Sequence, residues 1–431
     1  MPTHEALLFA TAWFGVFLVL GQNVATVLLG TGILGMWLMR GTRLFDGLLA
    51  PDIIATASSY SLSIIPLYLL MAQFLLRGRV VEDLFRVGYR LAGRRRFPLG
   101  AATIISGGLL GAVSGSGAAT AAALATMAAP QLQAVGYTRR FSIALSAVAG
   151  SLSAIIPPSI IMILYGSLTL VPVGHLFIGA MLPGVLCILV YIACLYLFGE
   201  TDRDASPTME ATAVSPQSLA AFVFVLALMT VVFGGIYGGI ITAAEAGAVG
   251  AFVALIGMLA MRRIGLRDIA AALVDSVKVT SMLMIIVIGA QIFGRFLSLS
   301  RAPRELLALL EPLLASPSLL VTLLLLAFFV FGLFLESAAV MVLLIPIIMP
   351  VLAAAQVDLL WFGVMACFMI SLGLLTPPVG LSTYAACAAA RHPVAPIFNR
   401  TGLFALVAAI VVSAVMIEFP AVVTWLPSRI Q

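Results

Sequence analysis

The sequence predicts an all-α polytopic membrane protein built from two inverted repeats, each with about five spans and one re-entrant hairpin. Three observations lead to this prediction. Apolar residues make up 63% of the 431 residues and charged residues 9%, against roughly half and a quarter in globular proteins. The apolar residues gather in stretches that approach the ~20 residues needed to cross a bilayer as a helix. Several motifs also recur along the chain at a nearly constant separation.

This composition excludes most other classes of protein. No soluble fold has enough interior to bury so much apolar surface, which excludes a cytoplasmic enzyme, a disordered chain and a secreted disulfide scaffold. The net charge of +5 does not indicate nucleic acid, because the basic residues lie between apolar stretches, where they orient membrane proteins. The four cysteines lie inside apolar segments without metal-ligand spacing, so we expect buried thiols.

Ten apolar segments are predicted to cross the membrane, and two of them are expected to be broken helices. The unbroken spans are Leu7–Leu20, Val24–Met39, Ile53–Leu76, Leu176–Phe198, Leu219–Tyr237, Ala243–Met261, Val277–Phe296 and Gly402–Trp425. The broken ones are Phe141–Leu170 and Leu359–Ala390.

Two further apolar blocks are too long for a single span. They cover Leu99–Gln133 and Leu319–Ala355, and each is interrupted near its middle by small or polar residues. An apolar block folded at its centre is typical of a re-entrant hairpin, whose non-helical tip is tolerated only against protein or a watery cavity. Two tightly linked full spans are the alternative, and either block alone is compatible with both.

Matching residues relate the two halves of the chain. The pairs Pro157-Pro158 and Pro377-Pro378 are 220 residues apart, and the same shift places Ser116 on Glu336. The ordered set of matches predicts two homologous halves. These are a first repeat over residues 1–199, with its hairpin at about 99–133 and its broken helix at about 141–170, a polar linker over 200–218, and a second repeat over 219–431, with its hairpin at about 319–355 and its broken helix at about 359–390.

Charge asymmetry predicts the orientation. The stretch Arg77–Arg96 carries seven arginines and should face the cytoplasm. Following the chain from there places fifteen basic residues inside, Arg203 among them, and five outside, including Arg301. Five crossings then separate Arg40 from Arg262, so the halves are inverted relative to each other, a plan used by secondary transporters. The termini come out on the periplasmic side.

Two charged segments are predicted to be helices in the headgroup plane. Arg77–Phe97 places apolar residues on one face and arginines on the other, and Arg301–Glu311 has the same division in the second half. Such segments suit the boundary between headgroups and acyl chains.

The Pro pairs are the strongest local signal. Two successive prolines break a helix, because proline has no N–H and its ring clashes with the carbonyl four residues back. The breaks free carbonyls near Ser153 and Ala154 and near Gly373 and Leu374, with Thr376 beside the second. A sodium ion suits such carbonyls, and the helix that starts after each break offers its positive end to a carboxylate. A static kink satisfied by serine hydroxyls is the alternative.

The hairpin tips carry the remaining polar candidates. Ser114, Gly115, Ser116 and Gly117 combine hydroxyls and open backbone with little bulk, so an ion or anion could approach closely. Tight helix packing is the other explanation for small residues. Glu336 at the second tip is a carboxylate in an apolar block, which is functional by default unless it is merely solvated near the interface.

These motifs resemble the large membrane subunit of TRAP transporters, the tripartite ATP-independent periplasmic carriers of bacteria and archaea. The resemblance implies an elevator-type, sodium-coupled carrier of an organic acid anion, such as a dicarboxylate, in the cytoplasmic (inner) membrane. It implies two partners, a small four-helix membrane subunit and an extracytoplasmic substrate-binding protein. The segments that carry it follow one another along nearly the whole chain: Gly111–Ala119, Pro130, Gly136-Tyr137, Ile156–Ile160, Tyr165-Gly166, Phe177, Gly179, Pro183-Gly184, Tyr237–Thr242, Glu245-Ala246 and Gly373–Gly380.

The resemblance also implies a set of site residues. No cofactor is expected, and sodium is the expected coupling ion. It would bind at Ser114, Gly115, Ser116, Ser153, Gly373, Thr376 and Pro377. The organic anion would bind at Ser116, Gly117, Ser159, Glu336, Val379 and Gly380. Three positions depart from the family pattern: Gly117 stands where a serine is frequent, Ala243-Ala244 where Pro-Thr is usual, and Met369 where an asparagine is common. The loss of these polar groups weakens an ion site or changes the substrate, which the sequence does not name.

Two other functions compete with this one. An autonomous sodium- or proton-coupled anion carrier of the same inverted-repeat plan would need no partner proteins. An intramembrane serine protease using Ser116 would need a base within hydrogen-bond reach, but the chain has only three histidines and none lies mid-span. We therefore predict a transporter subunit rather than an enzyme.

Overall fold

The computed structural model describes residues 3–93, 95–201, 215–300, 302–314 and 316–429. Within these ranges the chain is helical, with one isolated bridge between Tyr137 and Thr201. Seven helices of the described part are long and apolar enough to cross a membrane, which confirms the predicted all-α polytopic class. Most of the predicted linker, together with Arg203 and Arg301, lies outside the described residues.

The helices of the first half follow the predicted segments closely. In chain order they are α1 (Thr3–Val19), α2 (Val24–Arg40), α3 (Ala50–Ala57), α4 (Ile64–Arg77), α5 (Val80–Ala92), α6 (Arg96–Ser114), α7 (Gly117–Ala134), α8 (Arg139–Ser151), α9 (Ile160–Thr169), α10 (Val173–Gly179) and α11 (Met181–Phe198).

The second half repeats much of this pattern. Its helices are α12 (Pro216–Tyr237), α13 (Ala243–Ala260), α14 (Leu266–Ser300), α15 (Ala302–Leu314), α16 (Pro317–Gly332), α17 (Ser337–Ala354), α18 (Leu359–Gly373), α19 (Leu381–Ala389), α20 (Ala395–Glu418) and α21 (Ala421–Thr424). The predicted span Val277–Phe296 is the central part of the longer α14.

The predicted span Ile53–Leu76 is wrong as a single helix. The structure divides it into α3, a 3₁₀ turn η3 (Tyr60–Ser63) and α4. The Ser58 hydroxyl donates to the carbonyl of Ile54 at 2.7 Å, and the Ser63 hydroxyl to that of Tyr60 at 2.6 Å. Serine side chains that bond to nearby backbone compete with helix continuation, and this cluster explains the interruption.

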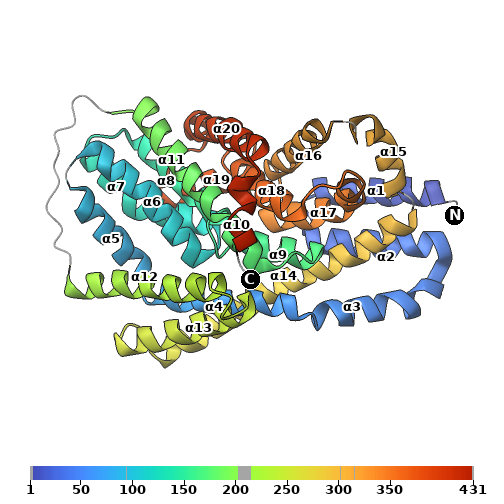
Figure 1. Ribbon diagram of the computed structural model, residues 1–431, viewed down its shortest axis with the longest axis horizontal. Coiled ribbons are helices and arrows are strands. Elements are labelled where there is room, and N and C mark those ends of the chain that lie inside the picture. Colours follow the sequence, from blue (N-terminus) through green and yellow to red (C-terminus); the bar gives the residue numbers. More distant parts are fainter. Residues whose placement is uncertain (1–2, 94, 202–214, 301, 315, 430–431) are drawn as a thin grey trace.

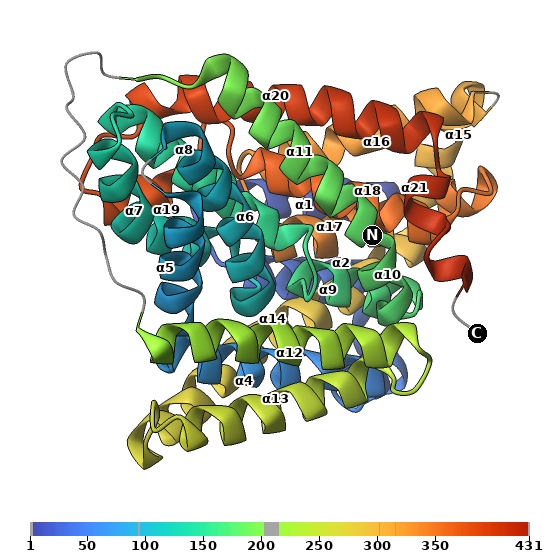
Figure 2. The same cartoon turned by 60° about the vertical axis from the view of Figure 1, so that its left-hand side comes forward.

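Six helices form a layer that we call the scaffold layer, packed in the order α1, α2, α14, α4, α13 and α12. Figure 2 shows α12, α13 and α4 side by side, with α5 meeting α12 at a steep angle at one end. Helices that match between the halves occupy mirrored places in this order: α1 with α12, α2 with α13, and α4 with α14. The order fits the predicted repeat, although the relative inversion of the halves stays a prediction.

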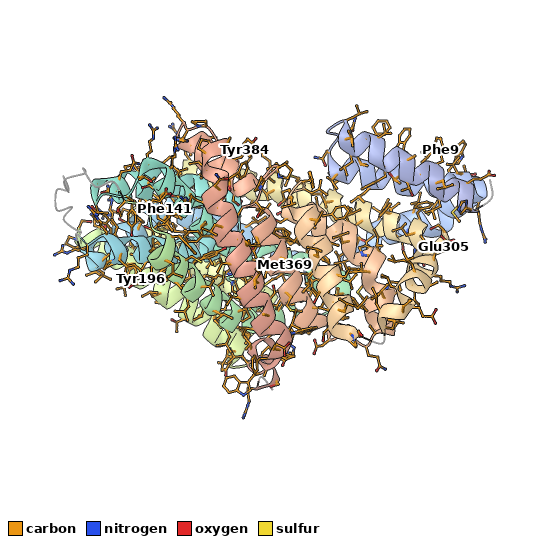
Figure 3. All side chains as sticks on the ribbon, turned by 90° about the horizontal axis from the view of Figure 1, so that it is seen from above. Phe9, Phe141, Tyr196, Glu305, Met369 and Tyr384 are labelled. Atoms are coloured by element: carbon orange, nitrogen blue, oxygen red, sulfur yellow. The ribbon has the colours of Figure 1, made fainter. Side chains whose placement is uncertain are left out.

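The remaining long helices form a second group, the hairpin bundle: the hairpins α6–α7 and α16–α17, the broken helices α8–α9 and α18–α19, and α11 and α20. Inside this bundle the two halves pack against each other, because α7 contacts α19 and α17 contacts α9. In Figure 1 the first hairpin lies at one end of the molecule and α15, α16 and α17 toward the other. Figure 3 shows Met369 of α18 between the end that carries Phe141 and the end that carries Glu305.

Helix α5 is amphipathic as predicted, but protein covers its apolar face. Val80 and Leu84 are buried, and α5 packs against α6 and α12. A buried ion pair fixes its start, since Arg263, between α13 and α14, donates to the carboxylate of Asp83 and to the carbonyl of Gly78 at 3.0 Å. Asp83 is only 4% exposed.

Removing this carboxylate should destabilise the fold. Asp83→Ala leaves the guanidinium of Arg263 without its buried counter-charge, which costs on the order of 3 kcal/mol. We expect a clearly lower midpoint of thermal unfolding in detergent. The control is Glu311→Ala on α15, which removes an exposed carboxylate and should stay within about 0.5 kcal/mol of the parent. Equal midpoints for the two variants would contradict a structural role of the pair.

Candidate ion and anion site

The first hairpin turns through four small residues. Helix α6 ends at Ser114, and Gly115 adopts a left-handed conformation with φ 63° while its N–H donates to the carbonyl of Gly111 at 2.8 Å. Ser116 caps α7, its hydroxyl accepting from the N–H of Ala119 at 3.4 Å. A left-handed glycine ends α6, and the capped start of α7 follows directly. Together these two features permit so tight a turn.

The first hairpin packs on α8 in a fixed register. A β-carbon placed on Gly107 would lie 2.4 Å from the carbonyl oxygen of Ala149, and one placed on Gly111 would lie 2.4 Å from Cα of Ser153. Glycine is therefore required for the helices to approach this closely. The second contact lies further toward the C-terminus than the first on both segments, so the hairpin tip lies at the same height as the break after α8.

The first break begins with a 3₁₀ turn, η4 (Leu152–Ala154), and α9 starts after the cis peptide bond of the first Pro pair. Ser159 is fully buried, and its hydroxyl donates to the carbonyl of Ala154 at 2.7 Å. Ser153 is equally buried, but its hydroxyl has no hydrogen-bond partner among the described residues. The static-kink interpretation thus accounts for Ser159 and leaves Ser153 unexplained.

The second hairpin meets the second break in the same way. A β-carbon on Gly373 would lie 2.6 Å from the carbonyl carbon and 2.8 Å from Cα of Gly332, at the end of α16. The tip after Gly332 therefore lies level with the second Pro pair. At this tip the exposed Glu336 caps α17, its carboxylate accepting from the N–H of Ala338 at 2.9 Å. Helix capping accounts for this bond, and substrate binding by Glu336 stays a prediction.

Hydroxyls close most of the second break. Thr376 donates to the carbonyl of Leu372 at 2.9 Å, and Thr383 donates to that of Leu375 at 3.0 Å. Gly380, with φ 57°, turns the chain into α19, and a β-carbon there would lie 2.7 Å from the ring of Phe398. The exposed Pro377 and the half-buried Val379 belong to the same turn.

The two halves meet at Gly117. A β-carbon there would lie 3.1 Å from Oγ of Ser382, 3.4 Å from Oγ of Ser153 and 3.6 Å from the carbonyl oxygen of Gly150. Ser382 is fully buried on α19, and its hydroxyl, like that of Ser153, lacks a hydrogen-bond partner among the described residues. The first tip, the first break and the helix after the second break thus come together at Gly117, a point that we call the Gly117 junction.

This arrangement joins part of the predicted set. Gly117 and Ser153 lie together, with Ser116 next in the chain, while Gly373 meets the other hairpin and Thr376 has its own bond within the second break. Sequence reasoning missed Ser382. The pair Ser382-Thr383 is a hydroxyl-bearing step in an apolar segment directly after a Pro pair, and that was the available signal.

The groups at the Gly117 junction suit either sign of charge. The hydroxyls of Ser153 and Ser382 and the carbonyl of Gly150 are neutral oxygen ligands, which suit a hard cation. Gly117 begins α7, and Ser382 lies in the first turn of α19, so two helix N-termini also face the region and favour an anion. Buried hydroxyls without partners are costly, and their presence calls for a ligand or water.

The fold defines a polytopic membrane protein. Residues 11–422 match the family described as the tripartite ATP-independent periplasmic transporter, DctM component, and the chain belongs to this family. It is therefore one component of a tripartite transport system. This confirms the predicted family and excludes an enzymatic role, including the protease hypothesis for Ser116.

Similar proteins support the assignment. The chain is 32% identical over 369 residues to a TRAP transporter large permease of Haemophilus influenzae, covering 84% of this chain and 85% of that protein. It is 30% identical over 383 residues to the C4-dicarboxylate TRAP transporter large permease of Pseudomonas aeruginosa, covering 88% and 89%. The crystal structure of the YdaH transporter of Alcanivorax borkumensis shares the fold, with a TM-score of 0.64 at 14% identity over 88% of this chain and 89% of that one.

The contact between Gly332 and Gly373 yields a test of the register. Gly373→Ala places a methyl group against backbone that cannot rotate away, so the helices must separate at a cost of about 1–3 kcal/mol. We expect a lower midpoint of thermal unfolding in detergent. Gly234→Ala on α12 is the matched control, because no atom lies within 4 Å of the added methyl and helix propensity favours alanine by up to ~1 kcal/mol. The same shift in both variants would count against the close approach.

Proposed function

We propose that the chain is the large permease subunit of a sodium-coupled, binding-protein-dependent secondary transporter that imports an organic acid anion. The observation that carries this proposal is the pair of buried, unpartnered hydroxyls of Ser153 and Ser382 on either side of Gly117. Sodium would draw its ligands from these hydroxyls and the nearby carbonyl of Gly150. A carboxylate of the cargo would lie toward the N-termini of α7 and α19.

The similar proteins support the rest of the proposal. A relative named for C4-dicarboxylates makes a small carboxylate the first substrate class to test. The tripartite family supports two partners, which we propose to be a small four-helix membrane subunit and an extracytoplasmic binding protein. We place the complex in the bacterial inner membrane.

We further propose an elevator motion in which the hairpin bundle moves as one body against the scaffold layer. Glycine contacts lock each hairpin to its broken helix, and α7–α19 and α17–α9 lock the halves to each other. Tyr165 on α9 also donates to the carbonyl of Leu359 on α18 at 2.6 Å. A group bound so closely would carry an ion at Gly117 without taking its site apart.

The sodium site is tested by removing its hydroxyls. Ser153→Ala and Ser382→Ala each delete one oxygen ligand, and a bond to a charged group is worth about 1.5 kcal/mol. We expect the sodium concentration for half-maximal uptake to rise about tenfold in proteoliposomes. Folding should be unaffected, because neither hydroxyl bonds to protein in the described structure.

The matched control is Ser146→Ala. Ser146 is a buried serine of α8 whose hydroxyl donates to the carbonyl of Ser142 at 2.9 Å, within its own helix. Its removal should leave the sodium dependence of uptake as in the parent. An unchanged sodium dependence in both Ser153→Ala and Ser382→Ala would overturn the proposed site.

The partners and the driving ion are tested by reconstitution. Proteoliposomes should take up the anion only when an inward sodium gradient, the small subunit and the loaded binding protein are all present. Uptake by the large subunit alone would establish the autonomous carrier instead. Uptake driven equally by a proton gradient without sodium would contradict sodium coupling.

A further inference from the structure

A second polar cavity lies away from Gly117, between the scaffold layer and the second hairpin. It has a volume of about 270 Å³ and takes its polar lining from Gln291, Arg295 and Ser298 of α14. Helix α17 provides the facing wall through apolar residues, among them Pro346. At ~30 Å³ per water this is room for about nine waters, which suits a small organic ion.

Arg295 is an unusual residue for this position. It lies on α14, a 35-residue helix apolar enough to span the membrane, where an ionised side chain is costly and functional by default. Its Nε and Nη2 donate to the two carboxylate oxygens of Asp52 on α3 at 3.0 and 2.7 Å. This bidentate bond fixes the plane of the guanidinium.

The ion pair leaves Arg295 able to bind more. A guanidinium has five N–H donors, and Asp52 uses two of them. No other described group accepts from Arg295, whose side chain remains 47% exposed. An oriented guanidinium with free donors, beside an amide and a hydroxyl, is the chemistry that recognises a carboxylate.

The two sides of the cavity belong to different bodies. Arg295 and Gln291 lie on the scaffold layer, whereas Pro346 lies on the second hairpin, and a β-carbon on Gly294 would lie 3.2 Å from Cβ of Pro346. A bound anion would therefore contact the fixed layer on one side and the moving bundle on the other. This position is distinct from the Gly117 junction.

We propose that Arg295, with Gln291 and Ser298, forms a second carboxylate-binding site, at which the anionic cargo contacts the scaffold layer before or after it occupies the bundle. This inference rests on the proposed function for the identity of the cargo. Asp52 holds the guanidinium in place and also competes with the anion for it. The alternative is that Arg295 and Asp52 only brace α14 against α3.

The site is tested by protection of an introduced cysteine. Ser298 is exposed to the cavity, and the four native cysteines are buried, so Ser298→Cys supplies a thiol with little background. Succinate should slow its alkylation by the uncharged reagent N-ethylmaleimide at least threefold, whereas succinamide, of the same shape without charge, should not. Ser316→Cys, exposed beyond α15, should show no protection.

The charge variants separate binding from bracing. Added to Ser298→Cys, Arg295→Gln should abolish protection by succinate, and Arg295→Lys should retain part of it. Asp52→Asn should strengthen protection, because it removes the competing carboxylate. A brace predicts the same direction of change for Arg295→Gln and Asp52→Asn, so opposite directions support the anion site and equal ones overturn it.

The remaining outcomes also decide the proposal. A thiol at residue 298 that is unreactive in the parent background would show that the cavity is not open to water, and would overturn it. Protection by phosphatidylglycerol in mixed micelles, but not by succinate, would assign the site to a lipid headgroup and overturn it too. The assay needs neither sodium nor uptake, so its failure would leave the sodium tests of Ser153 and Ser382 standing.

Discussion

The close approach of helix backbones at glycine is the constraint on which the rest of this structure depends. Gly107 and Gly111 bring α6 against α8, and Gly332 and Gly373 bring α16 against α18. Side chains at these positions would separate the helices, and each hairpin tip would no longer lie at the same height as the neighbouring break. The register in turn decides which backbone and hydroxyl groups face the interrupted helices. The absence of a Cβ atom at these glycines therefore determines where polar groups come together in an apolar bundle.

The hairpin bundle satisfies most of its polar groups internally, and this makes its exceptions informative. Ser159 and Thr376 close their breaks through their own hydroxyls, and Glu336 caps its own helix. Within the described part of the bundle, the hydroxyls of Ser153 and Ser382 are the buried side-chain groups that lack a hydrogen-bond partner. They come from opposite halves of the chain and lie on either side of Gly117, so an ion there would hold the halves together.

Charged groups are placed differently around the scaffold layer and at the Gly117 junction. Several described ion pairs tie the scaffold layer to itself or to its flanking helices, as between Arg77 of α4 and Asp275 of α14, at 2.5 Å. The Gly117 junction is surrounded by neutral groups instead. Neutral groups leave the net charge there to any bound ligand, whereas the ion pairs link scaffold helices at the periphery. The pair formed by Arg295 and Asp52 lies beside the cavity between α14 and α17.

The sequence by itself predicted the membrane class, most of the helices and the breaks at the two Pro pairs, because apolar length, proline and glycine act locally and leave direct signals. It also identified Gly117 and Ser153 as candidate site residues. It could not find Ser382, whose importance comes from packing between α7 and α19 across more than 260 residues of chain. Nor could it show that the Ser159 hydroxyl has a hydrogen-bond acceptor while the Ser153 hydroxyl has no partner among the described residues, since the two differ only in which acceptor lies within reach. The span Ile53–Leu76 failed for a related reason, because hydropathy does not register serines that bond to their own backbone. Local chemistry fixes where the chain bends, and only tertiary packing decides which of the exposed polar groups remain without a partner.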